Sequence, residues 1–260
     1  MILRRLVEHL RNQHWTGVFI ELAIVVLGVF IGMQVSNWNQ QRVTEQQAAV
    51  FTARLKADLR EEDWGYQFLI AYTGEVRSNA IRAVDALDGK APLPDEALLI
   101  SAYRATQYKQ RLRRRSTYDE LISTGNISLI RDQILRDTAM RLYNVATIEN
   151  LALEGLHSRY REAFRMSLPN EVQGALSKNC GDRYIQAGDF SRIHGILDYP
   201  CSTGLSAQVI AESARALRAN PELVPLLRLR IADIDTRLGD LIVNNRQILQ
   251  GLQTVVKENP

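Results

Sequence analysis

The sequence predicts an all-α protein: one N-terminal transmembrane helix that continues into a long helix, then an extramembrane helical bundle with one disulfide-closed loop. Three observations predict this. An apolar run occupies residues 18–38, apolar residues recur at helical spacing through most of the remaining chain, and two cysteines enclose an irregular stretch. Charged residues at 23% and hydrophobic residues at 46% are ordinary for a globular chain and argue against extensive disorder. A net charge of +3 gives no general case for nucleic-acid binding.

The apolar run is the strongest feature of the sequence. It reads VFIELAIVVLGVFIGMQVSNW from Val18, and Glu21 is its only ionisable residue. About 20 residues at 1.5 Å per residue match the roughly 30 Å hydrocarbon core of a bilayer. The run is too long for a signal-peptide core, and Trp15 and Trp38 bracket it as interfacial tryptophans do. We expect a transmembrane helix at 18–38, so the lipid bilayer is the first expected partner. The alternative is a buried helix of a soluble protein.

The tail at residues 1–17 indicates the orientation of this helix. Its charged residues are mostly basic: Arg4, Arg5 and Arg11 against Glu8. The positive-inside rule keeps such a tail in the cytoplasm, which places residues 39–260 in the periplasm. The tail is also amphipathic, so it is expected either to lie on the inner leaflet or to form a simple basic terminus.

Two cysteines support an exported domain. Cys180 and Cys201 enclose a stretch rich in Gly, Asp, Ser and Pro, and residues 178–204 lack helical periodicity. A single cysteine pair that closes one irregular loop is typical of an oxidising compartment. We therefore predict a disulfide, although two unrelated buried thiols would give the same count.

Two features within the predicted span are candidates for a role. Gly28 and Gly32 have the GxxxG spacing that allows two helix backbones to approach closely, so they predict a membrane helix contact. Glu21 is an intramembrane carboxylate, which is costly in lipid and therefore a candidate functional group. The alternative for Glu21 is a side chain that reaches back to the inner head groups.

The membrane segment, with the short basic tail before it, resembles a family of uncharacterised bacterial single-pass inner-membrane proteins. The residues that carry the resemblance are IELAIVVLGVFIGMQVSNWNQQR. Members of that family share a segment of the type E-[LI]-x-[IL]-V-V-x-G-[VI]-x-[IL]-G-x-Q-x-x-N-W-N. The stretch TYDELISTGNISLIRDQILRD is similar to a second part of that family. The resemblance implies a bacterial inner-membrane location. It implies no activity, cofactor or catalytic residue.

Beyond the span the sequence predicts helices separated by glycine and proline signals. Neither Gly nor Pro occurs between Met33 and Trp64, so the spanning helix is expected to continue as far as the stop at 88–94. Three helices should follow, and they are expected at about 95–112, from Ser116 to a C′ glycine at Gly125, and from about 127 to 167.

The C-terminal segment predicts one long helix after Asn220-Pro221. Its apolar residues alternate at spacings of four and three, a heptad stripe typical of a coiled coil: Leu227, Ile231, Ile234, Leu238, Leu241, Ile248, Leu252 and Val255. Asn245 is the single polar member of the stripe and a candidate for fixing register or oligomeric state. The stripe can pack within the chain or between two chains, and both possibilities stay open here.

One basic cluster stands out, in the sequence KQRLRRRS, expected at a helix end and turn. Its members are Lys109, Arg111, Arg113, Arg114 and Arg115. Such a cluster can receive an acidic partner, phospholipid head groups or an anionic ligand, or it can pair with acids such as Asp119 and Glu120. Elsewhere in the chain, we expect Glu61, Glu62 and Asp63, beside Trp64, to form a solvated acidic face.

The search for catalytic chemistry is negative. The sequence has no nucleotide-binding glycine loop, no HExxH, and no histidine or cysteine cluster at metal spacing, so we expect no enzyme, no cofactor and no metal site. Nucleic acid is not expected as a partner, given the predicted topology. The leading hypothesis is a membrane-anchored periplasmic structural or interaction protein that binds itself or an envelope protein. The alternatives are a periplasmic sensory or ligand-binding helical module and an accessory subunit of a proton-driven envelope complex.

Overall fold

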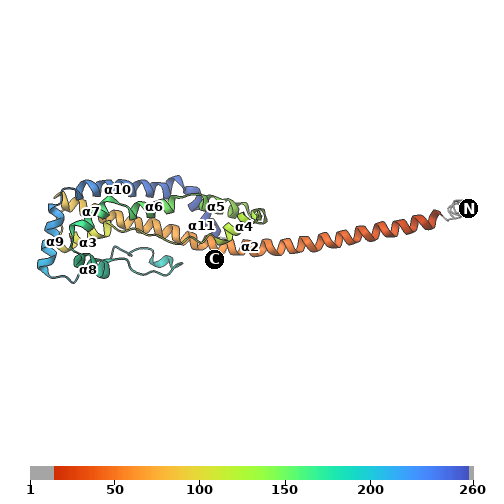
Figure 1. Ribbon diagram of the computed structural model, residues 1–260, viewed down its shortest axis with the longest axis horizontal. Coiled ribbons are helices and arrows are strands. Elements are labelled where there is room, and N and C mark those ends of the chain that lie inside the picture. The colour runs from red at the N-terminus through yellow and green to blue at the C-terminus, as the bar shows by residue number, and fades with distance from the viewer. Residues whose placement is uncertain (1–14, 258–260) are drawn as a thin grey trace, which may run out of the picture. The chain divides into compact units, whose positions relative to one another are not determined.

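The computed structural model describes residues 15–257 and confirms the predicted fold class, since no strand occurs in that range. The chain divides into two units, Met1–Thr52 and Ala53–Pro260. Figure 1 labels the α-helices, and the full order of helices is α2 (Trp15–Leu87), α3 (Asp95–Ala105), α4 (Ser116–Ser123), η1 (Ile127–Leu129), α5 (Gln133–Asn144), α6 (Thr147–Leu156), α7 (Arg159–Ser167), α8 (Asn170–Cys180), η2 (Phe190–Arg192), α9 (Ala207–Ala219), α10 (Leu223–Gly239), η3 (Asp240–Asn244) and α11 (Arg246–Lys257).

The described part of the first unit is the N-terminal portion of α2. From Leu22 on it is long enough and apolar enough to cross a membrane, and within 15–257 it is the one helix that meets this test. Its apolar side chains are not packed against protein: Ile24, Val25 and Phe30 are 63%, 62% and 57% exposed. Apolar side chains exposed all round a helix need an apolar surrounding other than a protein core.

Two helices of the second unit end at the positions that glycine predicts. After Leu87, Gly89 has a φ of 74°, and the Lys90 N–H donates to the Asp85 carbonyl at 2.9 Å. After α4, Gly125 has a φ of 71° and Asn126 N–H donates to the Leu121 carbonyl at 2.8 Å. Both are Schellman ends, in which a left-handed glycine lets the next N–H reach back to an otherwise unpaired carbonyl.

The helix expected at 95–112 is shorter than predicted. It ends at Ala105, and residues 107–115 form an extended segment, which we call the arginine segment. The Thr106 hydroxyl donates to the Tyr103 carbonyl at 2.6 Å, and Gln107 Nε2 donates to the same carbonyl at 3.3 Å. These side chains compete for the carbonyl that would continue the helix, so the chain leaves helical geometry there.

Two further helix predictions need correction. The expected helix at 127–167 is divided into η1, α5, α6 and α7. The expected long C-terminal helix begins at Leu223 and is interrupted by a π-helical turn, Asp240–Asn244, before α11. The Asn245 side chain causes part of this break, because its Nδ2 donates to the Asp240 carbonyl at 2.8 Å.

The core of the second unit is made by helices that are distant in sequence. α3 packs on α9, α10 on α7, and α11 on α5, as Figure 1 shows for the bundle. The main buried cluster draws on α2, α3, α7, α8, α9 and α10. The heptad stripe of the C-terminal segment lies inside this unit: Leu227, Leu241 and Leu252 are fully buried and Ile234 nearly so. The stripe therefore packs within the chain.

Candidate functional site

The arginine segment surrounds one buried carboxylate of α2. Glu62 has no exposed surface, and its Oε2 accepts from Arg113 Nε at 2.8 Å and from Arg111 Nη1 at 3.3 Å. Its Oε1 accepts from the Arg114 backbone N–H at 2.7 Å. Arg113 also donates to Glu149 Oε1 at 3.0 Å and to the Leu142 carbonyl. This network fixes the segment to α2, α5 and α6 and leaves none of the Glu62 oxygens unpaired.

The other members of the basic cluster also pair within the chain. Arg114 Nε lies 2.8 Å from Glu61 Oε2, Arg115 pairs with Asp119, and Lys109 pairs with Asp182. Each cation therefore has an acidic neighbour of its own chain. The structure does not bring the five basic residues together as a free anion-binding surface.

The prediction of a solvated acidic face at 61–63 is wrong for two of its three residues. Glu62 is fully buried and Asp63 is 1% exposed, and Trp64 beside them is 6% exposed. Asp63 Oδ2 accepts from Gln67 Nε2 at 2.9 Å, whereas Asp63 Oδ1 has no hydrogen-bond partner in the described chain. Burial raises the pKa of Asp63, and the hydrogen bond from Gln67 lowers it by less.

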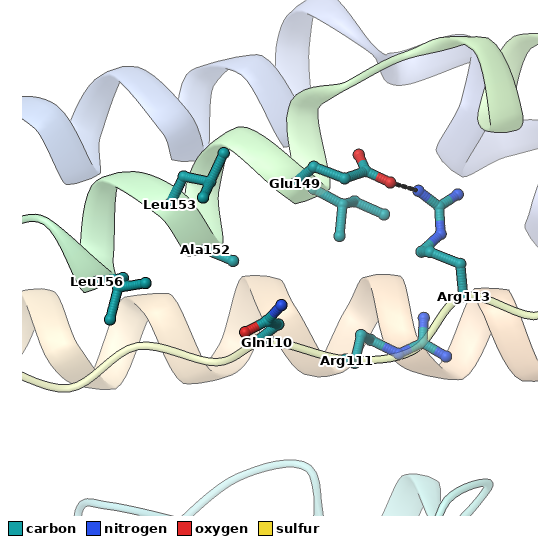
Figure 2. Close-up of a pocket in the computed structure, with 8 residues that line it drawn as sticks. Gln110, Arg111, Arg113, Glu149, Ala152, Leu153 and Leu156 are labelled. Atoms are coloured by element: carbon teal, nitrogen blue, oxygen red, sulfur yellow. Dashed lines mark hydrogen bonds and ion pairs between the residues drawn. The ribbon is translucent and has the colours of Figure 1, made fainter.

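A groove lies between the arginine segment and α6. It has a volume of about 220 Å³. Figure 2 shows α6 beside the segment, with the ion pair between Glu149 and Arg113 at one end. The lining residues are Gln110, Arg111 and Arg113 from the segment and Ile148, Glu149, Ala152, Leu153 and Leu156 from α6.

The groove is apolar along α6 and electrically neutral at its rim. Leu153 is 53% exposed and Leu156 is 39% exposed, so their side chains are available to a partner. The rim arginines Arg111 and Arg113 are already engaged by Glu62 and Glu149. The groove can therefore accept an apolar group, with Gln110 as a polar neighbour, and offers no unpaired cation to an anion.

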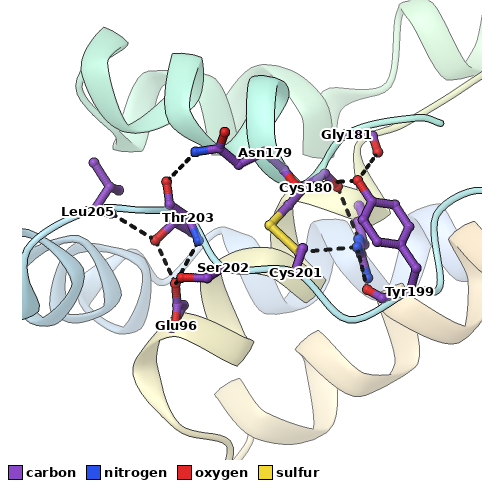
Figure 3. The surroundings of a disulfide bond; sticks show 10 residues. Glu96, Asn179, Cys180, Gly181, Tyr199, Cys201, Ser202, Thr203 and Leu205 are labelled. Atoms are coloured by element: carbon purple, nitrogen blue, oxygen red, sulfur yellow. Dashed lines mark hydrogen bonds between the residues drawn. A yellow bond between two sulfur atoms is a disulfide. The ribbon is translucent and has the colours of Figure 1, made fainter. Parts of the chain in front are cut away.

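The predicted disulfide is present and closes the loop that follows α8. Cys180 and Cys201 are bonded, with their Cα atoms 5.5 Å apart (Figure 3). Glu96 of α3 accepts from Thr203 N–H at 2.7 Å and from the hydroxyls of Thr203 and Ser202. These hydrogen bonds lower the pKa of Glu96, and those from Thr203 have the largest effect.

Two further side chains attach this loop to the bundle. The Glu75 carboxylate of α2 accepts from the N–H groups of Gly195, Leu197 and Asp198 at 2.5, 2.7 and 3.0 Å. Arg104 of α3 is 4% exposed and donates to the carbonyls of Cys180 and Tyr199. These contacts tie both ends of the loop to α2 and α3 and give partners to several of its backbone groups.

Asn245 finds its partners inside the chain. Besides the Asp240 carbonyl, its Nδ2 lies 3.3 Å from the Thr147 hydroxyl at the start of α6. The stripe position that it occupies faces the start of α6 of the same chain.

The membrane-segment candidates stay predictions. Gly28 and Gly32 lie one turn apart on α2, and a Cβ atom at either position would meet no other atom within 4 Å. The Glu21 side chain and residues 1–14, with the predicted amphipathic tail, lie outside the described residues.

Within residues 15–257 no group of three histidine, cysteine or acidic side chains is placed to hold a metal ion.

Comparisons of the chain with protein-family models, with curated proteins and with solved structures found no match. No local pattern in the sequence marks Glu75, Glu96 or Arg104, or the burial of Glu62, because the partners of these charged residues lie far away in the chain.

Proposed function

We propose that the protein is anchored in the bacterial inner membrane by residues 18–38, with its N-terminal tail in the cytoplasm and its helical domain in the periplasm. The exposed apolar side chains of α2 support the anchor, because lipid is the surrounding that removes them from water. The disulfide supports an oxidising compartment for the domain. The basic tail supports the orientation.

We propose that the domain is an interaction module that receives an apolar side chain of a protein partner in the groove beside the arginine segment. The observation that carries this is the groove itself, with exposed Leu153 and Leu156 on α6 and a neutral rim. Its volume of about 220 Å³ is below the roughly 300–1,000 Å³ usual for small-molecule pockets. This favours a protein anchor residue over the sensory or ligand-binding alternative.

Reporter fusions test the topology. A reporter active only in the periplasm, fused after Pro260, is expected to be active, and a cytoplasmic reporter at the same place is expected to be silent. The reverse pattern would overturn the orientation. Release of the chain from membranes by alkaline carbonate would overturn the anchor.

Substitution in the groove tests the interaction. Leu153→Glu places a charge in the groove at a half-exposed position, so the domain should fold while partner capture from mild-detergent membranes falls at least about tenfold. The matched control is Ile122→Glu on α4, because Ile122 is 45% exposed and does not line the groove. Equal capture by wild type and Leu153→Glu would show that the groove is not the interaction site.

A further inference from the structure

A second feature of the domain, independent of the groove, is a buried cation in contact with the disulfide. Arg104 of α3 is 4% exposed, a position where arginine normally pairs with an acid. Its Nη2 donates to Cys201 Sγ at 3.3 Å and to the Tyr199 carbonyl at 2.9 Å, and its Nε donates to the Cys180 carbonyl at 3.2 Å. Among the described residues no carboxylate joins these partners, so the guanidinium contacts neutral groups alone.

The acids around the disulfide are engaged by other groups. Asp198 attracts Arg104 at longer range, but its carboxylate forms an ion pair with Arg82 of α2 at 2.6 Å. Glu96 accepts from the Thr203 N–H and hydroxyl, both at 2.7 Å. Burial lowers the pKa of Arg104, because it disfavours the charged guanidinium. A negative charge placed against this guanidinium would therefore be stabilised strongly.

The loop is attached on both sides of Cys201 by contacts that do not involve the disulfide. Before Cys201, the Glu75 carboxylate accepts from the Leu197 N–H at 2.7 Å. After Cys201, the Glu96 carboxylate accepts from the Thr203 N–H, as Figure 3 shows. Breaking the bond between the two sulfurs removes neither contact. The sulfur of the reduced cysteine is therefore expected to stay beside the guanidinium.

Reduction of the disulfide supplies the missing negative charge at a sulfur that Arg104 already contacts. An adjacent cation lowers the pKa of a cysteine thiol below its ordinary value of about 8.5. A stabilised thiolate favours the reduced form over the disulfide, which makes the disulfide easier to reduce. Cys180 has no exposed surface, whereas Cys201 is partly exposed, so Cys201 is the cysteine that offers surface to a reagent.

We propose that Cys201 is a thiol–disulfide exchange site for a protein dithiol, with Arg104 as the group that stabilises the Cys201 thiolate. A thiolate of the dithiol attacks Cys201 Sγ, the bond to Cys180 breaks, and the Cys180 sulfur leaves and takes a proton from water. The second thiol of the dithiol loses its proton to water and attacks its own partner sulfur in the mixed disulfide. This step releases Cys201 as a thiolate beside Arg104. The dithiol is thereby oxidised to a disulfide, and the two cysteines of this chain are reduced.

The equilibrium test places the full chain, in mild detergent, in dithiothreitol redox buffers at pH 8 and counts free thiols by alkylation and mass. Arg104→Met should lower the equilibrium constant for reduction by about threefold or more relative to wild type. The matched control is Arg183→Met, because both arginines stack on the Tyr199 ring but Arg104 is the one that donates to Cys201. The control should keep the wild-type constant. A smaller decrease in Arg104→Met, or an equal decrease in both variants, would overturn the proposal.

A measurement on the reduced wild type covers the case in which Arg104→Met does not fold. The rate of alkylation of Cys201 by iodoacetamide follows its thiolate fraction, and peptide mass separates it from Cys180. For an ordinary cysteine this rate falls by about fiftyfold between pH 8.5 and pH 6.5. For Cys201 the decrease should be about tenfold or less, because the thiolate beside Arg104 persists to lower pH. A larger decrease would overturn the proposal and assign the disulfide a structural role alone.

Discussion

Arg113 Nε lies 2.8 Å from Glu62 Oε2, and both side chains are withdrawn from water. The two residues are far apart in the sequence, and their pairing fixes the extended arginine segment to the middle of α2. Arg111 and the Arg114 backbone share the same carboxylate. The groove proposed to receive a partner has this segment as one wall, so the shape of the groove depends on Glu62.

Glu62→Gln should therefore destabilise the domain strongly. The substitution keeps the shape but leaves Arg111 and Arg113 without their shared countercharge, at a cost of about 3–5 kcal/mol. Urea unfolding of the full chain in detergent measures this loss. The adjacent Asp63→Asn is the matched control, because Asp63 is equally buried but has no cationic partner in the described chain and one unpaired oxygen. It should raise the free energy of unfolding by on the order of 1 kcal/mol. Equal losses in the two variants would refute the special role of Glu62.

The effect of Asp63→Asn should depend on pH in a defined direction. Burial raises the pKa of Asp63 above its ordinary value of 3.8, so the folded state holds this proton more tightly than the unfolded state. Stability from Asp63 is then fully present below the unfolded pKa and is lost as pH rises through the folded pKa. The Tm advantage of Asp63→Asn over wild type should grow as pH is raised from about 4 to about 7. An advantage that shrinks over this range would contradict the assignment.

Two glycines of α2 should respond oppositely to alanine. A Cβ at Gly65 would collide with the Arg111 guanidinium, whereas a Cβ at Gly74 would meet nothing within 4 Å. Gly74→Ala should stabilise the domain by about 0.5–1 kcal/mol through helix propensity. Gly65→Ala should lose that gain and cost about 1–3 kcal/mol, because Arg111 must leave Glu62. Urea titrations of both variants give the comparison, and a gain in both would show that Arg111 moves freely.

Those parts of the fold that depend on residues close together in the sequence could be predicted, and those that depend on particular side-chain contacts could not. The ends of α2 and α4 follow from Gly89 and Gly125, which act within a few residues, and the disulfide follows from the two cysteines of one loop. By contrast, α3 ends early because the side chains of Thr106 and Gln107 form hydrogen bonds to a backbone carbonyl, and the helix propensities of the residues do not predict these bonds.

The candidate site was harder to predict than the helices. The run KQRLRRRS marks the basic cluster directly, whereas Glu62 lies in an acidic run of a kind that is usually solvated. Its burial is decided by arginines that are distant in the sequence. The heptad stripe likewise gave no sign of the π-helical turn, since Leu241 and Ile248 keep the apolar spacing on both sides of it.

Self-association through the membrane helix is the next testable expectation. Gly28 and Gly32 leave open space on α2, so a second copy of the helix could approach closely there. If this contact forms, replacing both glycines with Leu should lower the oligomeric mass measured by light scattering in detergent, after correction for bound micelle. The C-terminal stripe is buried in the chain, so Asn245→Leu should leave that mass unchanged. A wild type that is monomeric at all concentrations would remove the expectation.

Removing the disulfide should weaken the domain by about 3 kcal/mol on the chain-entropy model, given a sequence separation of 21. The Cys180→Ala/Cys201→Ala double variant measures this by urea titration. Reductant should bring the free energy of unfolding of the wild type close to that of the double variant and leave the double variant unchanged.

Arg104 adds a second cost, because its buried guanidinium donates to the carbonyls of Cys180 and Tyr199 and loses these partners if the loop moves away. Arg104→Met in the oxidised protein separates the contribution of Arg104 from that of the disulfide. This variant should lower the free energy of unfolding of the domain while both cysteines stay blocked to thiol reagents. Labelling of both thiols in freshly isolated native protein would argue against the disulfide and remove its support for a periplasmic domain.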